Sequence, residues 1–227
     1  MTNPTSEHHT NFSIRGISLE FPNSLLGSDI RQALDGGHYE MLEFDLIGQI
    51  VCPNDVVLEI GAAVGFVSAG IARRIADGRL VAVEANPELI AVAERTFELN
   101  NVKVDLRNAM VVGRTGSQPA SKFTITPSFW TSSNLAENGR TISVREVTLR
   151  SLVEEVQPTV LVTDIEGSEQ SLFDDVDLSG VRCAMVEVHK NVIGIQGVRT
   201  VFDRLAEHGL FYDPDISAYH VVTFSRS

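Results

Sequence analysis

The stretch Asp55-Val-Val-Leu-Glu-Ile-Gly-Ala-Ala-Val-Gly-Phe66 decides the fold of this 227-residue chain. Its apolar run predicts a buried strand, and the glycines at 61 and 65 predict a tight turn that leads into a helix. Glycine has no side chain, so it lets a backbone approach a ligand closely. Glu59 stands just before the turn, where a carboxylate could accept a hydrogen bond from an ammonium group or orient the turn. The stretch therefore predicts a ligand site at the end of a strand.

Apolar runs alternate with helical patterns along the rest of the chain. The runs are DVVLEI, LVAVEA, VKVDLR, TVLVTDI and CAMVEV. Continuous apolar strands separated by helices are typical of a parallel sheet that is covered on both faces. The last two apolar runs, GLFYD and YHVVTFS, are too close together for a parallel crossover. We expect a Rossmann-like, seven-stranded, mostly parallel α/β fold whose last strand is antiparallel.

We expect one domain. Residues 1–54 form a small N-terminal cap with one strand, FSIRGISLEF, and one or two helices from Ser28 to about Gln49. Residues 55–227 form the core, and 112–147 form an insertion with strands at SKFTITP and TISVREV. Ligands of open α/β sheets bind at the carboxyl ends of the strands, so the insertion and the cap are placed to cover the site.

Composition limits the partners. The net charge of −12 argues against nucleic acid and against anionic membrane surfaces, because both require a basic surface. Only two cysteines occur, Cys52 and Cys183, and no apolar run approaches the roughly 18 residues that a membrane span needs. Two packed cysteines and no signal peptide predict a cytoplasmic location. The sequence leaves the choice between monomer and homo-oligomer open.

A second carboxylate follows the next strand, in VAVEANP, where Glu84 could accept both hydrogens of a ribose diol. The rival ligand is a dinucleotide, whose fingerprint Gly-x-Gly-x-x-Gly places a pyrophosphate at the helix N-terminus. Ala63 and Phe66 occupy the second and third glycine positions here. A sulfonium amino acid has no phosphate to hold, so the spacing favours S-adenosylmethionine over NAD.

At these residues a resemblance becomes visible. EIGAAVG followed by VEANP resembles class I S-adenosylmethionine-dependent methyltransferases, and TLRSLV, LVTDIEGSEQSLF and MVEVHK are similar to the FkbM family in particular. In that family a strand ends in Asp-x-Glu-Gly-x-Glu, here Asp164, Glu166, Gly167 and Glu169. GGHYE and TSSNL also match, so the resemblance spans about residues 36–190. Members commonly carry Asp at the position of Glu59 and Asn at that of Ala63.

The resemblance implies a cofactor site and an activity. Glu84 would hold the ribose, the Tyr39-Glu40 segment would lie near the cofactor, and Asn108 would contact the adenine unless it is a turn residue. The activity would be O-methylation of a hydroxyl on a sugar, polyketide or similar natural product. The expected cofactor-binding residues are Tyr39, Glu40, Glu59, Gly61, Ala62, Gly65, Phe66, Glu84, Ala85, Asn86, Asn108 and Asp164.

Two strand ends carry the candidate catalytic groups. Asp164 and Glu166 lie two residues apart, as do Glu187 and His189, so in extended backbone each pair shares a face. If the two strands are parallel neighbours, all four groups meet near the methyl group. Our hypothesis is that His189, whose ordinary pKa is near 6.5, is the base, and that Asp164 or Glu187 orients it and binds the acceptor. The same four residues could instead bind a divalent ion such as magnesium, a less favoured interpretation.

The insertion is expected to bind a small hydroxylated acceptor. Trp130 could stack on a planar face, and Ser132, Ser133 and Asn134 could bond hydroxyl groups; aromatics packed into the core are the equal alternative. Two functional alternatives stay open: a non-catalytic partner protein that binds S-adenosylmethionine, and an NAD-dependent oxidoreductase, which the glycine spacing disfavours.

Overall fold

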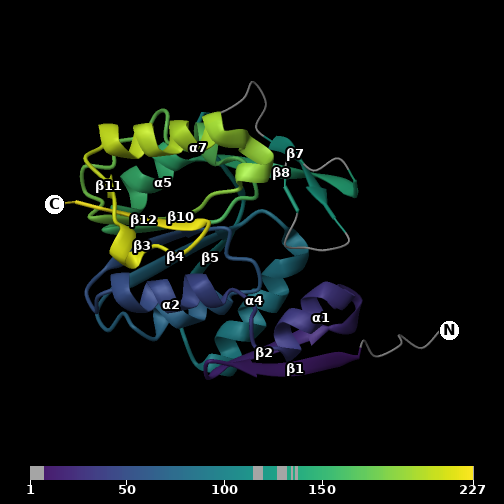
Figure 1. Ribbon diagram of the computed structural model, residues 1–227. Helices are drawn as coiled ribbons and strands as arrows, with labels where there is room; N and C mark the ends of the chain where they lie inside the picture. Colours follow the sequence, from purple (N-terminus) through teal and green to yellow (C-terminus); the bar gives the residue numbers. More distant parts are fainter. Residues whose placement is uncertain (1–7, 115–119, 127–131, 134, 136–137, 227) are drawn as a thin grey trace.

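The computed structural model describes residues 8–114, 120–126, 132–133, 135 and 138–226 (Figure 1). Its centre is a seven-stranded sheet in the order β11-β12-β10-β9-β3-β4-β5. The strands are β3 (Val56–Ile60), β4 (Arg79–Glu84), β5 (Asp105–Asn108), β9 (Val160–Thr163), β10 (Cys183–Glu187), β11 (Phe211–Tyr212) and β12 (Val221–Ser225). The five strands from β10 to β5 run parallel, and β12 runs antiparallel to both of its neighbours. The predicted Rossmann-like, mostly parallel sheet is confirmed.

Helices cover both faces of this sheet, with α5 and α7 on one side and α2 and α4 on the other (Figure 1). Alternation along the strands explains the two layers. In β3, Val57 belongs to one hydrophobic cluster with α2, α3 and α4, whereas Leu58 belongs to the other with α5 and α7. The helices are α1 (Ser28–Asp35), α2 (Met41–Ile50), α3 (Phe66–Ala72), α4 (Pro87–Asn100), α5 (Leu149–Val156), α6 (Glu169–Leu172) and α7 (Lys190–Glu207), with 3-10 turns at Asn23–Leu25 and Pro214–Ile216. Within the described ranges, no helix has the length and apolarity to cross a membrane.

The N-terminal strand prediction was wrong in one respect. FSIRGISLEF forms two strands, β1 (His9–Ile14) and β2 (Ile17–Pro22), which pair antiparallel. Arg15 and Gly16 both have positive φ, 50° and 78°, the conformation of a tight two-residue hairpin turn. The hairpin packs on α4, where the Asn100 side chain bonds both the N–H and the C=O of Ser18 at 3.0 and 2.7 Å.

The insertion forms a small sheet of its own. It contains β6 (Met110–Val112), β7 (Ala120–Ile125) and β8 (Arg140–Thr148) in the order β6-β8-β7. The segments SKFTITP and TISVREV, predicted as strands, lie largely in β7 and β8. Because β6 begins two residues after β5 ends, this sheet stands beside the carboxyl ends of the central strands, next to the predicted site.

Candidate active site

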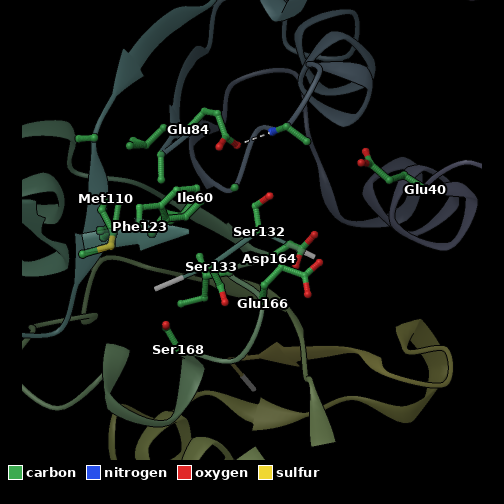
Figure 2. A pocket seen from close by; sticks show the side chains of 17 residues that line it. Glu40, Ile60, Glu84, Met110, Phe123, Ser132, Ser133, Asp164, Glu166 and Ser168 are labelled. Atoms are coloured by element: carbon green, nitrogen blue, oxygen red, sulfur yellow. Dashed lines mark hydrogen bonds between the residues drawn. The ribbon is translucent and has the colours of Figure 1, made fainter. Parts of the chain in front are cut away.

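A pocket opens at the carboxyl ends of β3, β4 and β9, beneath the small sheet (Figure 2). It contains about 690 Å³ of space, part of it open to solvent. Its position matches the carboxyl-end rule for open α/β sheets. The described lining residues are Glu40, Ile60, Gly61, Ala63, Val83, Glu84, Ala85, Ala109, Met110, Val111, Phe123, Ser132, Ser133, Asp164, Ile165, Glu166 and Ser168.

The glycines of the turn after β3 are required by neighbouring protein atoms. A Cβ at Gly61 would lie 1.7 Å from the carbonyl oxygen of Asp164, and one at Gly65 would lie 2.6 Å from Cε1 of Phe97. Both glycines also have left-handed φ, 91° and 78°. The missing side chains make room for the Asp164 loop and for α4; Gly61 also lines both cavities of the site, so close approach of a ligand there stays a prediction.

Glu84 closes β4 and faces the pocket. Its Oε2 accepts a hydrogen bond from the backbone N–H of Ala63 at 2.8 Å, drawn as a dashed line in Figure 2. Its Oε1 accepts a hydrogen bond from the backbone N–H of Asn86 at 2.6 Å. Burial raises the pKa of this carboxyl group, and the two backbone hydrogen bonds oppose the rise. A carboxylate has about four lone-pair sites, so Glu84 keeps acceptor capacity for a diol.

Two asparagines of the predicted site are used inside the protein. The side-chain amide of Asn108 donates to the carbonyl oxygens of Glu84 and Ala85 at 2.9 and 3.2 Å. Asn86 caps α4 by accepting the N–H of Glu88 at 3.0 Å. Neither residue lines the pocket, so in this structure Asn108 braces the turn that would receive an adenine.

Four further predicted cofactor residues lie behind the wall of the pocket. Tyr39 and Phe66 are fully buried, with ring centroids 5.9 Å apart, and Ala62 and Gly65 are absent from the described lining. Sequence reasoning missed the apolar wall made by Met110, Val111, Phe123 and Ile165. The MVV run after Asn108 was the available signal for this wall; it is short and opens the insertion.

A second, smaller cavity adjoins the first and shares Glu40, Gly61 and Asp164 with it. Its lining also includes Glu43, Glu59 and Glu187, and no described lining residue of either cavity is a lysine or arginine. Glu59 is 2% exposed and accepts a 2.5 Å hydrogen bond from Ser68. Burial raises the pKa of Glu59 to about 8. This side of the site is suited to a positively charged ligand.

The four candidate catalytic groups come together. β9 and β10 are parallel neighbours with Thr163 opposite Val186, so the residues that follow them reach the same edge. Nε2 of His189 lies 3.3 Å from Glu166, 3.5 Å from Glu187 and 3.7 Å from Asp164, measured to a carboxyl oxygen of each. Oδ1 of Asp164 is buried and has no hydrogen-bond partner among the described residues.

The hydrogen-bond partner of the imidazole is Glu169. Its Oε1 lies 2.6 Å from Nδ1 of His189, so the expected orienting role of Asp164 or Glu187 falls to a residue that we had placed only in the family motif. Burial lowers the pKa of His189, but the bond to Glu169 and the charges of Asp164 and Glu166 outweigh burial and raise it to about 9.

The carboxyl groups of this cluster hold protons unusually firmly. Burial raises the pKa of Glu166 to about 7, although the charge of His189 opposes the rise. Burial and the charges of Glu43 and Glu166 raise the pKa of Glu187 to about 8. The pKa of Asp164 is raised well above its ordinary value by burial and by the charges of Glu187 and Glu166. Glu166, Glu187 and His189 therefore form a cluster of groups that gain or lose protons between about pH 7 and pH 9.

Two sets of side chains could geometrically hold a metal ion. Asp164, Glu166 and His189 each offer a ligand atom within 4.8 Å of the others, and so do Glu43, Glu187 and His220.

The insertion contributes two of its four predicted acceptor residues. Ser132 and Ser133 line the pocket, and Figure 2 shows both near Asp164 and Glu166. The Ser132 hydroxyl accepts the N–H of Thr126 at 3.0 Å. Trp130 and Asn134 lie outside the described residues.

Solved structures of similar fold belong to one class of enzyme. Precorrin-6y C5,15-methyltransferase from Geobacter metallireducens has a TM-score of 0.51 and 13% identity, over 91% of this chain and 92% of that one. TYW2 of M. jannaschii, solved with AdoMet, has a TM-score of 0.50 and 12% identity, over 100% and 90%. The Pyrococcus abyssi tRNA (uracil-54, C5)-methyltransferase, in complex with S-adenosyl-L-homocysteine, has a TM-score of 0.50 and 13% identity, over 96% and 43%. At such identity the likeness shows the fold: that of class I methyltransferases.

The family follows from the sequence itself. The Methyltransferase FkbM domain matches residues 59–209, more than half of the chain. The protein belongs to the FkbM methyltransferase family and uses S-adenosylmethionine. No curated protein sequence matches the chain significantly. The predicted family and cofactor are confirmed.

Proposed function

We propose that this enzyme transfers the methyl group of S-adenosylmethionine to a hydroxyl oxygen of a small molecule. The observation that carries the proposal is the meeting of three carboxyl groups around one imidazole nitrogen, within 3.7 Å, beside the pocket. An alcohol is a poor nucleophile at neutral pH, so its methylation needs a nearby proton acceptor, which is worth about 100- to 10,000-fold in rate.

The chain's residues fit the cofactor. S-adenosylmethionine supplies a methyl group that is already strongly electrophilic because it is bound to a positively charged sulfur. Glu84 has acceptor capacity for the ribose diol, and the apolar wall of Met110, Val111 and Phe123 suits a flat heterocycle. The carboxylates Glu40 and Asp164 face the shared part of the two cavities, where positive charge is stabilised. Alignment of acceptor, methyl and sulfur is then the main task of the protein.

The cluster handles the proton of the acceptor. Asp164 or Glu187 binds the acceptor hydroxyl, and His189 takes the proton at Nε2 once that nitrogen is unprotonated. With a pKa of about 9, the imidazole of the ligand-free protein carries its proton at neutral pH. A positive charge bound beside the cluster lowers the pKa of each of these groups, so binding of the cofactor prepares the base.

A small acceptor is favoured over a nucleic acid, although methyltransferases that act on tRNA share the fold. The chain has a net charge of −12, and the described pocket lining has carboxylates and no lysine or arginine. Phosphate backbones need basic contacts for affinity. Ser132 and Ser133 at the pocket suit an acceptor that carries hydroxyl groups, such as a sugar or a polyketide of natural-product biosynthesis.

Methyl-labelled S-adenosylmethionine tests the acceptor class. The enzyme is incubated with matched panels of polyhydroxylated sugars and polyketides, primary amines, and bulk tRNA, and the products are identified by mass spectrometry. Label on an oxygen in the first panel is the expected result. Label confined to amines or tRNA, or binding of the cofactor with no transfer at all, contradicts O-methylation of a small molecule.

We propose catalysis without a metal ion. Nε2 of His189 lies within 3.7 Å of Asp164 and Glu166, so the cluster offers a proton acceptor without the help of a metal ion. Activity is expected to survive prolonged dialysis against a chelator. Loss of activity that returns on addition of magnesium or manganese would establish the metal-dependent alternative.

A further inference from the structure

A buried carboxylate lies beneath the catalytic cluster. Glu169 is the first residue of α6 and is 0% exposed. Its Oε1 accepts the backbone N–H of Gly167 at 2.9 Å and lies 2.6 Å from Nδ1 of His189. Its Oε2 is buried without a hydrogen-bond partner among the described residues. The cost of burying this charge is therefore met chiefly by one imidazole and one amide.

Glu169 lies outside the described lining of both cavities. His189 is also absent from both linings, but its side chain is 13% exposed whereas that of Glu169 is 0% exposed, so Glu169 acts on a ligand only through the groups that it holds. Asp164, Ile165, Glu166 and Ser168, from the same segment, do line the main pocket.

The first group that Glu169 holds is the turn that presents Glu166. Glu166 has a φ of 52° and Gly167 a φ of 103°, and an L-residue at positive φ is strained. Gly167 is packed under α7, because a Cβ there would lie 2.4 Å from Cγ1 of Val192. The hydrogen bond from the Gly167 N–H to Glu169 stabilises this strained turn and so fixes where the Glu166 carboxylate points.

The second group is the imidazole. A carboxylate at Nδ1 accepts a hydrogen bond there, which fixes Nδ1 as the protonated nitrogen in the neutral ring. Nε2 is then the nitrogen that exchanges a proton. The groups that face it are Asp164 and Glu166 from the loop after β9 and Glu187 from β10; His220, from the turn before β12, faces Glu187 at 3.4 Å.

We propose that Glu169 is the positioning residue of the active site: through one oxygen it fixes the tautomer and orientation of His189 and the direction of Glu166. The inference rests on the proposed function, in which His189 receives the acceptor proton. It assigns to the last Glu of the Asp-x-Glu-Gly-x-Glu motif a role distinct from that of the first two acidic residues, which face the ligand.

The test follows His189 directly. The full chain, saturated with S-adenosylhomocysteine, is labelled with ¹⁵N-histidine and titrated by NMR as wild type and as Glu169→Gln. Removal of a neighbouring opposite charge is expected to lower the His189 pKa by about 1–3. The pH midpoint of methyl transfer should move down with it, while the Kd of S-adenosylhomocysteine changes less than about threefold, because Glu169 does not line the pocket.

Two further variants separate positioning from general damage. Glu169→Asp keeps the charge and should restore much of the wild-type His189 pKa, whereas Glu154→Gln, a matched charge removal at an exposed site on α5, should change neither quantity. A folded Glu169→Gln protein with an unchanged His189 pKa overturns the proposal. If that variant fails to fold, the wild-type spectrum decides: a neutral His189 protonated at Nε2 overturns the proposal, and one protonated at Nδ1 supports it. The histidine titration and the S-adenosylhomocysteine affinity need no acceptor, so these two measurements stand apart from any failure of the proposed O-methylation.

Discussion

The two ends of the pocket satisfy their carboxylates in opposite ways. At the end of β4, each oxygen of Glu84 accepts a short hydrogen bond from a backbone N–H. At the ends of β9 and β10, three carboxyl groups share one imidazole nitrogen at 3.3–3.7 Å, and Oδ1 of Asp164 has no hydrogen-bond partner among the described residues. The first end is a rigid receptor that is complete before a ligand binds. The second is short of positive charge and of hydrogen-bond donors, which a cationic cofactor and a hydroxylated acceptor would supply.

The largest effect is expected from His189→Gln. Glutamine keeps a polar side chain but cannot take a proton, so kcat should fall by about 100- to 10,000-fold. Calorimetry should find S-adenosylhomocysteine bound with wild-type affinity to within a few-fold. Near-normal turnover would remove His189 from the mechanism. A loss of S-adenosylhomocysteine affinity as large as the loss of kcat would show that the ends of β9 and β10 bind the cofactor as much as they serve the reaction.

Glu84→Gln should chiefly weaken the binding of the cofactor, whereas His189→Gln should chiefly lower kcat. The amide NH₂ would face a backbone N–H of Ala63 or Asn86, and hydrogen bonds to a charged group are worth about 1.5–3 kcal/mol. The Kd of S-adenosylhomocysteine is therefore expected to rise by about 10- to 100-fold. Glu88→Gln, on the exposed first turn of α4, is the matched control. Unchanged affinity in Glu84→Gln would mean that the ribose is held elsewhere.

The pH profile sharpens the comparison further. The pKa values of Glu166, Glu187 and His189 are about 7, 8 and 9, and the proton acceptors among them work only when deprotonated. kcat/KM should therefore rise as the pH increases from 7 to 9. A profile that is flat over this range, measured in buffers of constant ionic strength, would show that no group of the cluster takes a proton from the acceptor.

The smallest effect concerns stability. Raised pKa values mean that the folded protein binds more protons than the unfolded chain, so stability is present at low pH and is lost as the pH rises through the folded values. For Glu59 this window runs from about 4.5 to about 8. The Tm of the ligand-free protein should fall by a few degrees between pH 6 and 9, since ~1 kcal/mol corresponds to about 2–4 °C at this size. Glu59→Gln should make the Tm depend less on pH. A steeper fall of Tm with pH in this variant would contradict the raised pKa of Glu59.

The sequence was most informative about which strand ends meet. Parallel pairing of β9 and β10 was sufficient to bring Asp164, Glu166, Glu187 and His189 to one edge of the sheet, although only Glu187 lies in a strand and Glu166 has a φ of 52°, so the extended backbone assumed for each pair was wrong. The direction of a single side chain at a strand end follows no such rule. From the sequence, an adenine contact and a turn contact were equally consistent with Asn108. Only the tertiary structure shows that its side-chain amide donates to the backbone carbonyl oxygens of Glu84 and Ala85.

Other features could not be predicted from the sequence, because they depend on contacts between residues that are far apart in the chain. Glu169 reaches His189 across twenty residues, and Phe123 lines the pocket only because the small sheet lies over it. The hairpin at Arg15-Gly16 was missed for a local reason: the apolar alternation continues through the turn, and a single glycine was its only signal.

Gly61 joins the two ends mechanically. The space where its side chain would be is filled by the carbonyl oxygen of Asp164, so the turn after β3 and the loop that carries Asp164 are in direct contact. A methyl group added at position 61 would therefore push against the loop that carries Asp164. A substitution in the turn after β3 would thus disturb the acidic cluster at the ends of β9 and β10.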